Sequence, residues 1–323
     1  MTIKLGIVMD PIADVNVKKD STYAMMVAAK AKGWTLFIME QKDLSLLQGE
    51  AYGAMSECTL TGENKNWYSL SSATNQPLSN LDVLLMRKDP PVDSEFIYAT
   101  YILERAETQG VLVVNKPQSL RDCNEKVFAT AFPQCCPPVI ISRDVNTLKR
   151  FVEEHQHVIF KPLDGMGGTS IFNVKAGDPN IGVILETLNQ FGQNHVMAQR
   201  YIPEIAAGDK RILIIDGKPI DYALARIPSK GDHRGNLAAG GRGEALPLSE
   251  RDRWIVSEIS EDLVKRGLIF VGIDVIGDYL TEINVTSPTC IQEIDRAYDL
   301  DIAGELMRVI ETKLSDRSSN KKP

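Results

Sequence analysis

The residues best suited to chemistry lie between Asp274 and Asn284. Glu282 and Asn284 are two residues apart in a stretch rich in β-branched side chains, and side chains two apart in a strand point to the same face. Their oxygen atoms suit a hard cation such as Mg²⁺, which completes its shell with water and phosphate. Taken alone, a solvent-facing carboxylate beside a turn-stabilising amide is the commoner case.

The preceding carboxylate, Asp274, raises a question of strand geometry. The stretch is typical of two strands joined at Gly277-Asp278. A simple two-residue loop would pair Asp274 with Thr281, so Asp274 would face away from Glu282. All three oxygen-bearing side chains can share one site only if the loop has an odd length or one strand carries a bulge. We therefore predict an odd loop or a bulge between Asp274 and Glu282.

Two lysines and a glycine-rich segment indicate a phosphate site. Lys161 ends an apolar run and is followed by Asp164-Gly-Met-Gly-Gly-Thr-Ser170. A glycine-rich loop between two strands lets backbone N–H groups approach a phosphate closely, although this loop lacks the Gly-Lys-Ser/Thr of a P-loop. The alternative is a flexible hairpin with a surface lysine. Lys126 is expected on a helix capped by Asp122 or Asn124, where a solvated lysine is the commoner case.

Further candidates follow along the chain. Gln199–Ile202 ends a strand whose main chain could bind adenine, and Asp209 could accept hydrogen bonds from a ribose; an ordinary strand end fits as well. Arg211 is suited to stabilising developing negative charge. Residues 226–243 combine arginines with glycines, which favours a lid over an anionic ligand, or a disordered surface loop. We expect Ile227–Arg242 to be poorly ordered without ligands.

The pattern of predicted strands and helices that must position these residues changes near Pro117. Before it, apolar strands alternate with helices, which predicts a doubly wound, mostly parallel sheet; Leu44–Asn80 fits an antiparallel hairpin or long loops. The expected strands are Lys4–Met9, Thr35–Glu40, Leu81–Met86 and Val111–Asn115, with helices at Asp20–Lys32 and Ser94–Gln109.

After Pro117, short alternating strands are interrupted by three helices, which indicates α+β subdomains. The expected strands are Val139–Ser142, Val158–Lys161, Ser170–Val174, Val196–Ile202, Arg211–Ile215 and Pro219–Arg226, and the helices are Asp144–His155, Ile181–Phe191 and Glu250–Arg266.

Composition narrows the class of protein. The 323 residues carry a formal charge of −7, which argues against non-specific nucleic-acid binding. No apolar run reaches the ~18–20 residues of a membrane span, and the amino terminus has no signal-peptide pattern. Five cysteines favour a reduced, cytoplasmic protein. The polar end, residues 317–323, is expected to be disordered.

The phosphate loop, the basic residues and the oxygen ligands together predict ATP-dependent phosphoryl transfer.

In this order, the motifs resemble the ATP-grasp superfamily, and within it the bacterial glutathione synthetases. The similarity covers nearly the whole chain except Leu44–Asn80 and the tail. The runs that carry it are Lys4–Pro11, Met86–Pro91, Asn115–Lys126, Lys161–Gly168, Arg234–Glu244 and Thr281–Thr289.

The resemblance implies the fold and the assembly. An N-terminal doubly wound α/β domain (residues 1–121) would precede a pair of α+β ATP-grasp subdomains (122–202 and 203–316) that grip ATP between them. The assembly would be a homotetramer with neither nucleic-acid nor membrane partners.

The reaction implied is γ-glutamylcysteine + glycine + ATP → glutathione + ADP + phosphate, through an acyl phosphate, with two Mg²⁺ ions or Mn²⁺ in their place. By the same resemblance, Arg211, Arg234, Gly240 and Gly241 would be catalytic, and Asp274, Glu282 and Asn284 would hold the metal. ATP would contact Lys126, Lys161, Gly165, Gly167, Gly168, Gln199, Arg200, Tyr201, Ile202 and Asp209. The peptide substrate would contact Arg87, Arg226, Arg234, Ser287 and Thr289.

Two rival readings share the nucleotide machinery. One is another ATP-grasp ligase, such as a D-alanine–D-alanine or glutamate-adding ligase; the Met86–Pro91 and Arg234–Glu244 runs favour a glutathione synthetase over these. The other is a non-catalytic ATP-binding protein resembling synapsin, against which the presence of Arg211 and the three metal candidates argues.

Overall fold

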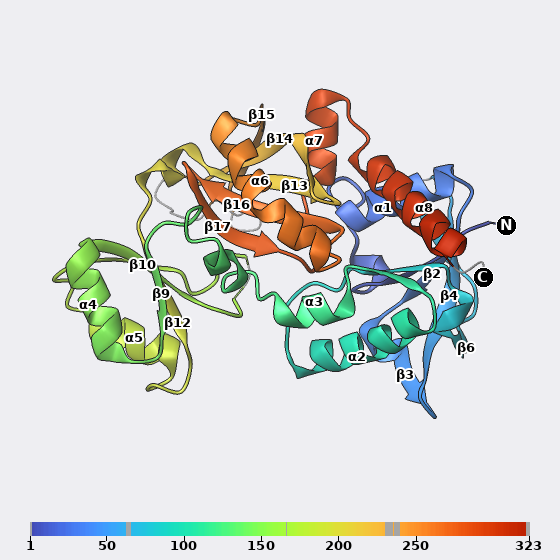
Figure 1. Ribbon diagram of the computed structural model, residues 1–323, viewed down its shortest axis with the longest axis horizontal. Coiled ribbons are helices and arrows are strands. Elements are labelled where there is room, and N and C mark those ends of the chain that lie inside the picture. Colours follow the sequence, from blue (N-terminus) through green and yellow to red (C-terminus); the bar gives the residue numbers. More distant parts are fainter. Residues whose placement is uncertain (1, 63–65, 166, 230–234, 236–239, 321–323) are drawn as a thin grey trace.

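The computed structural model describes residues 2–62, 66–165, 167–229, 235 and 240–320, which form three β-sheets with helices packed against them (Figure 1). The first sheet has the strand order β3-β4-β2-β1-β7-β8. Its parallel part consists of β1 (Lys4–Val8), β2 (Thr35–Met39), β7 (Val83–Met86) and β8 (Leu112–Val114). The doubly wound sheet predicted for the N-terminal part is therefore confirmed.

The helices of this sheet begin within one residue of their predicted starts, and each has a side-chain cap. Asp20 accepts a hydrogen bond from the amide of Tyr23 and starts α1 (Ser21–Ala31). Asp93 does the same for Phe96 and starts α2 (Ser94–Thr108). Three short 3₁₀ helices, η1 (Ile12–Asp14), η2 (Gln41–Asp43) and η3 (Leu78–Asn80), lie in the connections.

The segment Leu44–Asn80 extends the sheet with antiparallel strands, as one of the two expectations had it. β4 (Glu50–Leu60) pairs with β2 and carries β3 (Leu44–Leu47), β5 (Tyr68–Leu70) and β6 (Thr74–Pro77) along its length. Every second residue of β4 is buried over most of its length, which is the pattern of a strand with one covered face.

The chain leaves the first sheet through α3 (Pro117–Asp122) and η4 (Phe128–Ala131). Lys126 lies in the turn between them, so the helix expected around it is wrong. Asn124 caps that turn instead, because its side-chain oxygen accepts from the amides of Lys126 and Val127. The short polar side chain offers the backbone an alternative to continuing the helix.

The second sheet is antiparallel, in the order β11-β10-β12-β9, and projects at the left of Figure 1. Its strands are β9 (Val139–Ser142), β10 (His157–Pro162), β11 (Phe172–Lys175) and β12 (Val196–Arg200). Its two helices, α4 (Val145–His155) and α5 (Ile181–Asn189), supply Leu148 and Leu185 to a core closed by Val158 and Phe160 of β10.

The third sheet, in the order β15-β14-β13-β16-β17, is also antiparallel. Its strands are β13 (Asp209–Ile215), β14 (Lys218–Ile227), β15 (Arg242–Pro247), β16 (Phe270–Ile276) and β17 (Tyr279–Asn284), with η5 (Pro203–Ala207) before β13 and α6 (Glu250–Lys265) after β15. The α+β character predicted for the second half of the chain is confirmed.

Two C-terminal helices return to the first sheet. α7 (Ile291–Tyr298) and α8 (Ile302–Asn320) both pack against α1 (Figure 1). Residues 317–320 continue α8, and Arg317 donates to the carbonyl of Val111, so the disordered tail expected from residue 317 is wrong over these four residues. No helix in the described part of the chain is long and apolar enough to cross a membrane.

One buried amide joins the first and third sheets. Asn115, at the end of β8, donates to the carbonyls of Phe270 and Val285, both at 2.7 Å. Its side-chain oxygen accepts from the amides of Ile269 and Phe270 at 2.7 and 2.9 Å. All four bonds are buried, so this side chain fixes where β16 starts and where β17 ends.

Candidate active site

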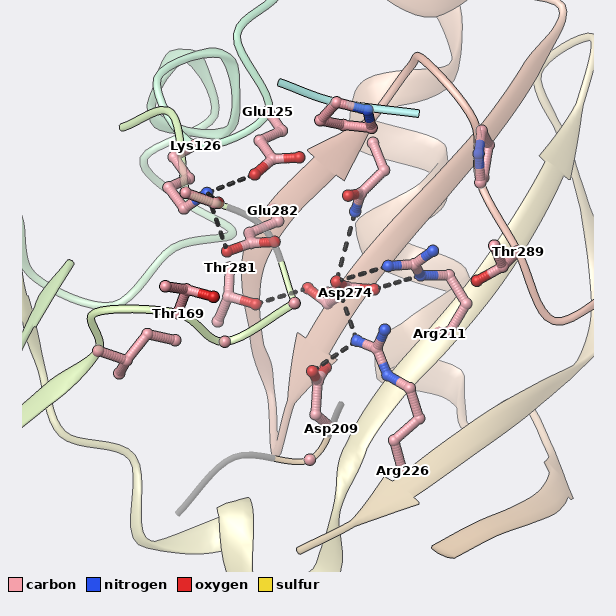
Figure 2. Close-up of a pocket in the computed structure, with 18 of the residues that line it drawn as sticks. Glu125, Lys126, Thr169, Asp209, Arg211, Arg226, Asp274, Thr281, Glu282 and Thr289 are labelled. Carbon is pink, nitrogen blue, oxygen red and sulfur yellow. Dashed lines mark hydrogen bonds and ion pairs between the residues drawn. The ribbon is translucent and has the colours of Figure 1, made fainter. Parts of the chain in front are cut away.

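A cavity of about 500 Å³ is lined by residues of the first sheet's loops, the second sheet and the third sheet (Figure 2). Most of the residues singled out from the sequence line it. Among the described residues these are Lys126, Lys161, Gly165, Gly167, Gly168, Gln199, Tyr201, Ile202, Asp209, Arg211, Arg226, Asp274, Glu282, Asn284, Ser287 and Thr289.

The β16–β17 hairpin places its carboxylates on one face by means of a bulge. Ile276 pairs with Tyr279 across the two-residue turn Gly277-Asp278, but Asp274 pairs with Glu282. Thr281 is the extra residue, and its hydroxyl donates to the carbonyl of Asp274 at 3.1 Å. The predicted bulge is confirmed, and it resolves the geometric conflict that a plain two-residue loop would have created.

Asp274 is held by two arginines. Arg211 binds it in a bidentate manner, with Nε to Oδ1 at 2.5 Å and Nη2 to Oδ2 at 2.9 Å, and Arg226 Nη2 lies 2.9 Å from Oδ2. Burial opposes ionisation of this carboxyl, but the two guanidinium groups outweigh it and hold the pKa of Asp274 well below its usual range.

Glu282 faces two lysines from different elements. Its Oε1 lies 3.3 Å from Lys161 Nζ on β10 and 3.8 Å from Lys126 Nζ. Burial works against the charged form, yet the lysines lower the pKa of Glu282. Lys126 also pairs with Glu125, whose own pKa is raised by burial and by Glu282. Glu125 was not predicted as a site residue, and its position next to Lys126 is the one signal for it in the sequence.

The glycine-rich loop between β10 and β11 is anchored to the same lysine. Lys126 Nζ donates to the carbonyl of Gly165 at 2.7 Å, and Asn124 Nδ2 donates to that of Leu163 at 3.0 Å. Gly167 and Gly168 have φ of 64° and 82°, in the left-handed region that glycine adopts without strain. Three glycines of this loop line the cavity beside Lys161, which suits close approach of a phosphate.

The end of β12 forms another wall. Tyr201 stacks on His157 with ring centroids 3.9 Å apart, and its amide donates to the His157 carbonyl. Arg200 is absent from the lining; its amide donates to the Pro138 carbonyl and its guanidinium to the Tyr279 hydroxyl at 2.9 Å. The amides of Arg200 and Tyr201 are therefore both used in hydrogen bonds within the protein.

Asp209, expected at the ribose, lies beside the arginine pair. Its Oδ2 accepts from Arg226 Nη2 at 2.5 Å, while Oδ1 is buried and has no hydrogen-bond partner among the described residues. Burial raises the pKa of Asp209 to about 6, although Arg226 opposes the shift. This carboxylate oxygen is thus available to a ligand hydroxyl.

Of the remaining substrate-binding candidates, some line the cavity and one does not. Ser287 donates to Asp89 Oδ1 at 2.6 Å, and both line the cavity. Arg87 does not line it: the guanidinium is buried, donates to Thr22 and to the Pro288 carbonyl, and burial lowers its pKa to about 10.

Only part of the expected lid belongs to the described residues. Gly240 and Gly241 are described but are not among the cavity-lining residues, and the Gly240 carbonyl accepts from Ser229 Oγ at 2.7 Å. Arg234 and most of the range Ile227–Arg242 lie outside the described residues. The prediction that this range is poorly ordered without ligands therefore stays a prediction.

The donor set fits a hard divalent cation. Asp274, Glu282 and Asn284 present two carboxylates and an amide on one sheet face, and Asn284 Nδ2 lies 3.3 Å from Asp274 Oδ2. Within the described ranges, no three His, Cys, Asp or Glu side chains form a metal-binding group, so a bound ion would complete its shell from solvent or ligand oxygens. Four buried basic side chains face these acids, which suits a polyphosphate.

Comparison with known proteins agrees with this geometry. The N-terminal domain model of prokaryotic glutathione synthetase matches residues 3–121, and the ATP-grasp domain model of the same enzymes matches residues 125–299. The chain is similar to the glutathione synthetases of Pseudomonas aeruginosa and Pseudomonas putida, with 61% and 60% identity over 317 residues. The alignments cover 98% of this chain and 100% of each relative.

Solved structures share the fold at low sequence identity. The D-cycloserine synthetase DcsG superposes with a TM-score of 0.68 at 13% identity, covering 96% of this chain and 99% of that one. The ATP-grasp ligase PsnB, bound to a precursor peptide and AMPPNP, gives 0.63 at 16% identity over 97% and 98% of the two chains. These likenesses show the ATP-grasp fold and no more.

Proposed function

The chain belongs to the prokaryotic glutathione synthetase family, and we propose on that premise that it joins γ-glutamylcysteine to glycine with conversion of ATP to ADP and phosphate. Membership makes it an ATP-grasp ligase. The observation that carries the site assignment is the Asp274–Glu282 pair, because each carboxylate faces two basic side chains inside one cavity.

Lys126, Lys161 and the glycine-rich loop would bind the phosphates of ATP. Both lysines are buried and converge on Glu282 from separate elements, so their positions are set before ATP arrives. The backbone N–H groups of Gly167 and Gly168 add donors at the cavity wall. The main chain of Gln199–Ile202 would bind adenine, and the free Oδ1 of Asp209 would accept from the ribose.

Asp274, Glu282 and Asn284 would hold Mg²⁺, or Mn²⁺ in its place, and two ions in the full complex. The cation neutralises charge on the phosphates when bound. The chain's own contribution is the bulged hairpin, which aims both carboxylates at one point. The four basic side chains keep these carboxylates ionised and therefore able to bind a cation at neutral pH.

In the first step the cysteinyl carboxylate of the dipeptide attacks the γ-phosphorus, and ADP leaves. In the second, the unprotonated amine of glycine attacks the acyl phosphate carbonyl, phosphate leaves with the bonding pair, and the amine proton passes to solvent. Arg211 would stabilise the charge on the tetrahedral intermediate, since a fixed guanidinium needs no reorganisation there. Arg226, Arg234, Ser287 and Thr289 would orient the peptide substrate, and Gly240 and Gly241 would close over it. Arg87 would act through the Pro288 carbonyl, which it binds and which lines the cavity.

The test is phosphate release from ATP by the purified protein. We expect release with γ-glutamylcysteine plus glycine, dependent on both, and background release with D-alanine alone. Turnover with D-alanine and none with the dipeptide would assign the chain to another ATP-grasp specificity. Nucleotide binding without turnover of any of these substrates would indicate a binding protein on the same fold.

We further propose the assembly, the compartment and the domain bounds that the family resemblance implies. The chain would form a homotetramer in the cytoplasm, with domains at residues 1–121, 122–202 and 203–316. Light scattering on the eluting protein measures the assembly, and a mass of one or two chains would contradict the tetramer. Limited proteolysis near residues 121 and 202 tests the boundaries.

A further inference from the structure

Two side-chain contacts join strands of the second sheet to the β16–β17 hairpin of the third. At one, Lys161 Nζ on β10 lies 3.3 Å from Glu282 Oε1 on β17. At the other, Nη2 of Arg200, the last residue of β12, donates to the hydroxyl of Tyr279, the first residue of β17, at 2.9 Å. The first contact belongs to the phosphate and cation site. The second has no part in the proposed reaction.

The two contacts are spaced alike on both sides. On the second sheet, Arg200 pairs with Val158, which is three residues before Lys161. On the hairpin, Tyr279 is three residues before Glu282. Three residues of strand span ~10 Å, so the second sheet meets the hairpin at two well-separated points. Two such points fix an orientation, whereas one would fix only a distance.

Arg200 reaches the hairpin from outside the cavity. Its partner across β10, Val158, packs in the core under α4 and α5, so the Arg200 side chain starts on that side of the sheet and does not line the cavity. Tyr279 pairs with Ile276, which is two residues from Asp274, so Tyr279 shares the sheet face of the metal candidates. The contact therefore links the helix-covered face of β12 to the functional face of the hairpin.

Both partners are held in place. The Arg200 guanidinium lies over the Tyr279 ring, with Cζ 5.3 Å from the ring centroid, and its Nε is buried without a hydrogen-bond partner among the described residues. An arginine able to turn towards water would satisfy that group, so packing fixes this side chain. The turn before Tyr279 is fixed by Arg251, whose Nε donates to the Asp278 carbonyl at 3.0 Å.

Ligand binding would leave the outer contact as the remaining link. A phosphate at Lys161 and a cation at Glu282 would each compete with the 3.3 Å contact between these two side chains. Neither Arg200 nor Tyr279 lines the cavity, so their contact competes with neither ligand. It can therefore keep the phosphate side and the cation side aligned while the inner contact opens.

We propose that Arg200 and Tyr279 are positioning residues that align Lys161 with the cation ligands of the hairpin, and so couple binding of the nucleotide to binding of Mg²⁺. The inference rests on the proposed function, which places the phosphates at Lys161 and the cation at Glu282. In it, the Arg200 side chain acts through Tyr279 and does not contact ATP. Loss of the contact should therefore weaken the nucleotide mainly when the cation is present.

The experiment measures nucleotide binding and does not depend on turnover. The dissociation constant of ADP is determined by calorimetry, with and without Mg²⁺, for the wild type, Arg200→Met, Tyr279→Phe and the double variant. We expect each single variant to weaken binding about 10-fold with Mg²⁺, the low end of the range for a hydrogen bond to a charged group, and under about 3-fold without it. The double variant should lose no more than either single variant, because both remove the same contact.

Two matched controls remove the same chemical groups elsewhere. Tyr52→Phe removes a hydroxyl that donates to Glu50 in the first sheet, and Arg150→Met removes an exposed arginine from α4. Neither should change the affinity for ADP in either condition.

Four results would overturn the proposal. Equal losses with and without Mg²⁺ would indicate a merely structural role, and a loss in Arg200→Met alone would indicate direct contact with the nucleotide. Additive losses in the double variant would make the two roles independent, and unchanged binding in both single variants would leave the contact without a role. A wild type that shows the coupling but does not turn over γ-glutamylcysteine with glycine would remove the proposed ligase reaction and keep the positioning role.

Discussion

Asp274 and Glu282 are direct cross-strand neighbours, yet each pairs with a different type of basic side chain: Asp274 binds arginines and Glu282 binds lysines. The arginines come from β13 and β14 of the same sheet, whereas the lysines come from β10 and from the turn after α3. One face of the hairpin thus connects the third sheet, through Glu282 and Lys161, to the second sheet. Closing the second sheet over a nucleotide would change the surroundings of Glu282 more than those of Asp274.

Glu282→Gln should reduce kcat at least ~100-fold while the protein stays folded. The amide keeps the shape but removes the charge that would bind the cation, and even outer-shell changes at metal sites cost about 10- to 100-fold. Turnover at modest Mg²⁺ and far-UV circular dichroism measure the two effects. Glu261→Gln, an exposed change on α6, is the control. Near-normal activity would exclude Glu282 as a ligand.

Arg211→Lys should lower kcat by about 10²- to 10³-fold and change KM for ATP much less. Lysine keeps the charge but loses the planar fork that now binds Asp274 through Nε and Nη2, and loss of one preorganised donor costs this much in comparable sites. Steady-state kinetics with ATP varied separate the parameters. The exposed Arg253→Lys serves as control. An effect on KM alone would assign Arg211 to binding.

Asn115→Ala should destabilise the protein by roughly 3 kcal/mol or more. Four buried backbone groups lose their partner: the amides of Ile269 and Phe270 and the carbonyls of Phe270 and Val285. Each unsatisfied buried group costs about 1–3 kcal/mol. The shift in the urea midpoint measures the loss. Asn80→Ala, at an exposed position, should shift it little. A loss below about 1 kcal/mol would mean that solvent replaces the amide.

Asp295→Asn should stabilise the protein at pH 8 and lose this advantage as the pH falls towards 4. Burial raises the pKa of Asp295 to about 6 in the folded chain, so the protonated form is favoured by folding. That contribution is complete below the unfolded pKa of ~3.9 and is lost as the pH rises through 6. Since the group is half exposed, we expect a gain of only about 1 kcal/mol at pH 8.

The Asp295 prediction is checked by urea unfolding of both proteins at pH 4 and at pH 8. Asparagine keeps the oxygen that accepts from the amide of Ile302, so the comparison isolates the charge. A difference that does not vary with pH would show that ionisation of Asp295 has no part in it.

Local rules account for most of what the sequence predicted. The helices predicted to start at Asp20 and Ser94 begin within one residue of those positions. The alternation of side chains along a strand required an odd loop or a bulge, and the structure has the bulge, at Thr281. These predictions succeed because sterics and hydrogen-bond periodicity act over a few residues. Where two local signals compete the prediction fails: Asn124 caps a turn, and the helix expected through Lys126 does not form.

Only the tertiary structure decided which distant groups meet. Nothing near Glu282 in the chain indicates that Lys126 and Lys161 would face it, that Glu125 would join them, or that Arg87 would be buried away from the cavity. Likewise, polar residues 317–320 remain helical because α8 packs on α1 and Arg317 reaches Val111. Such contacts depend on how whole sheets and helices pack, and long-range packing leaves no periodic trace in the sequence.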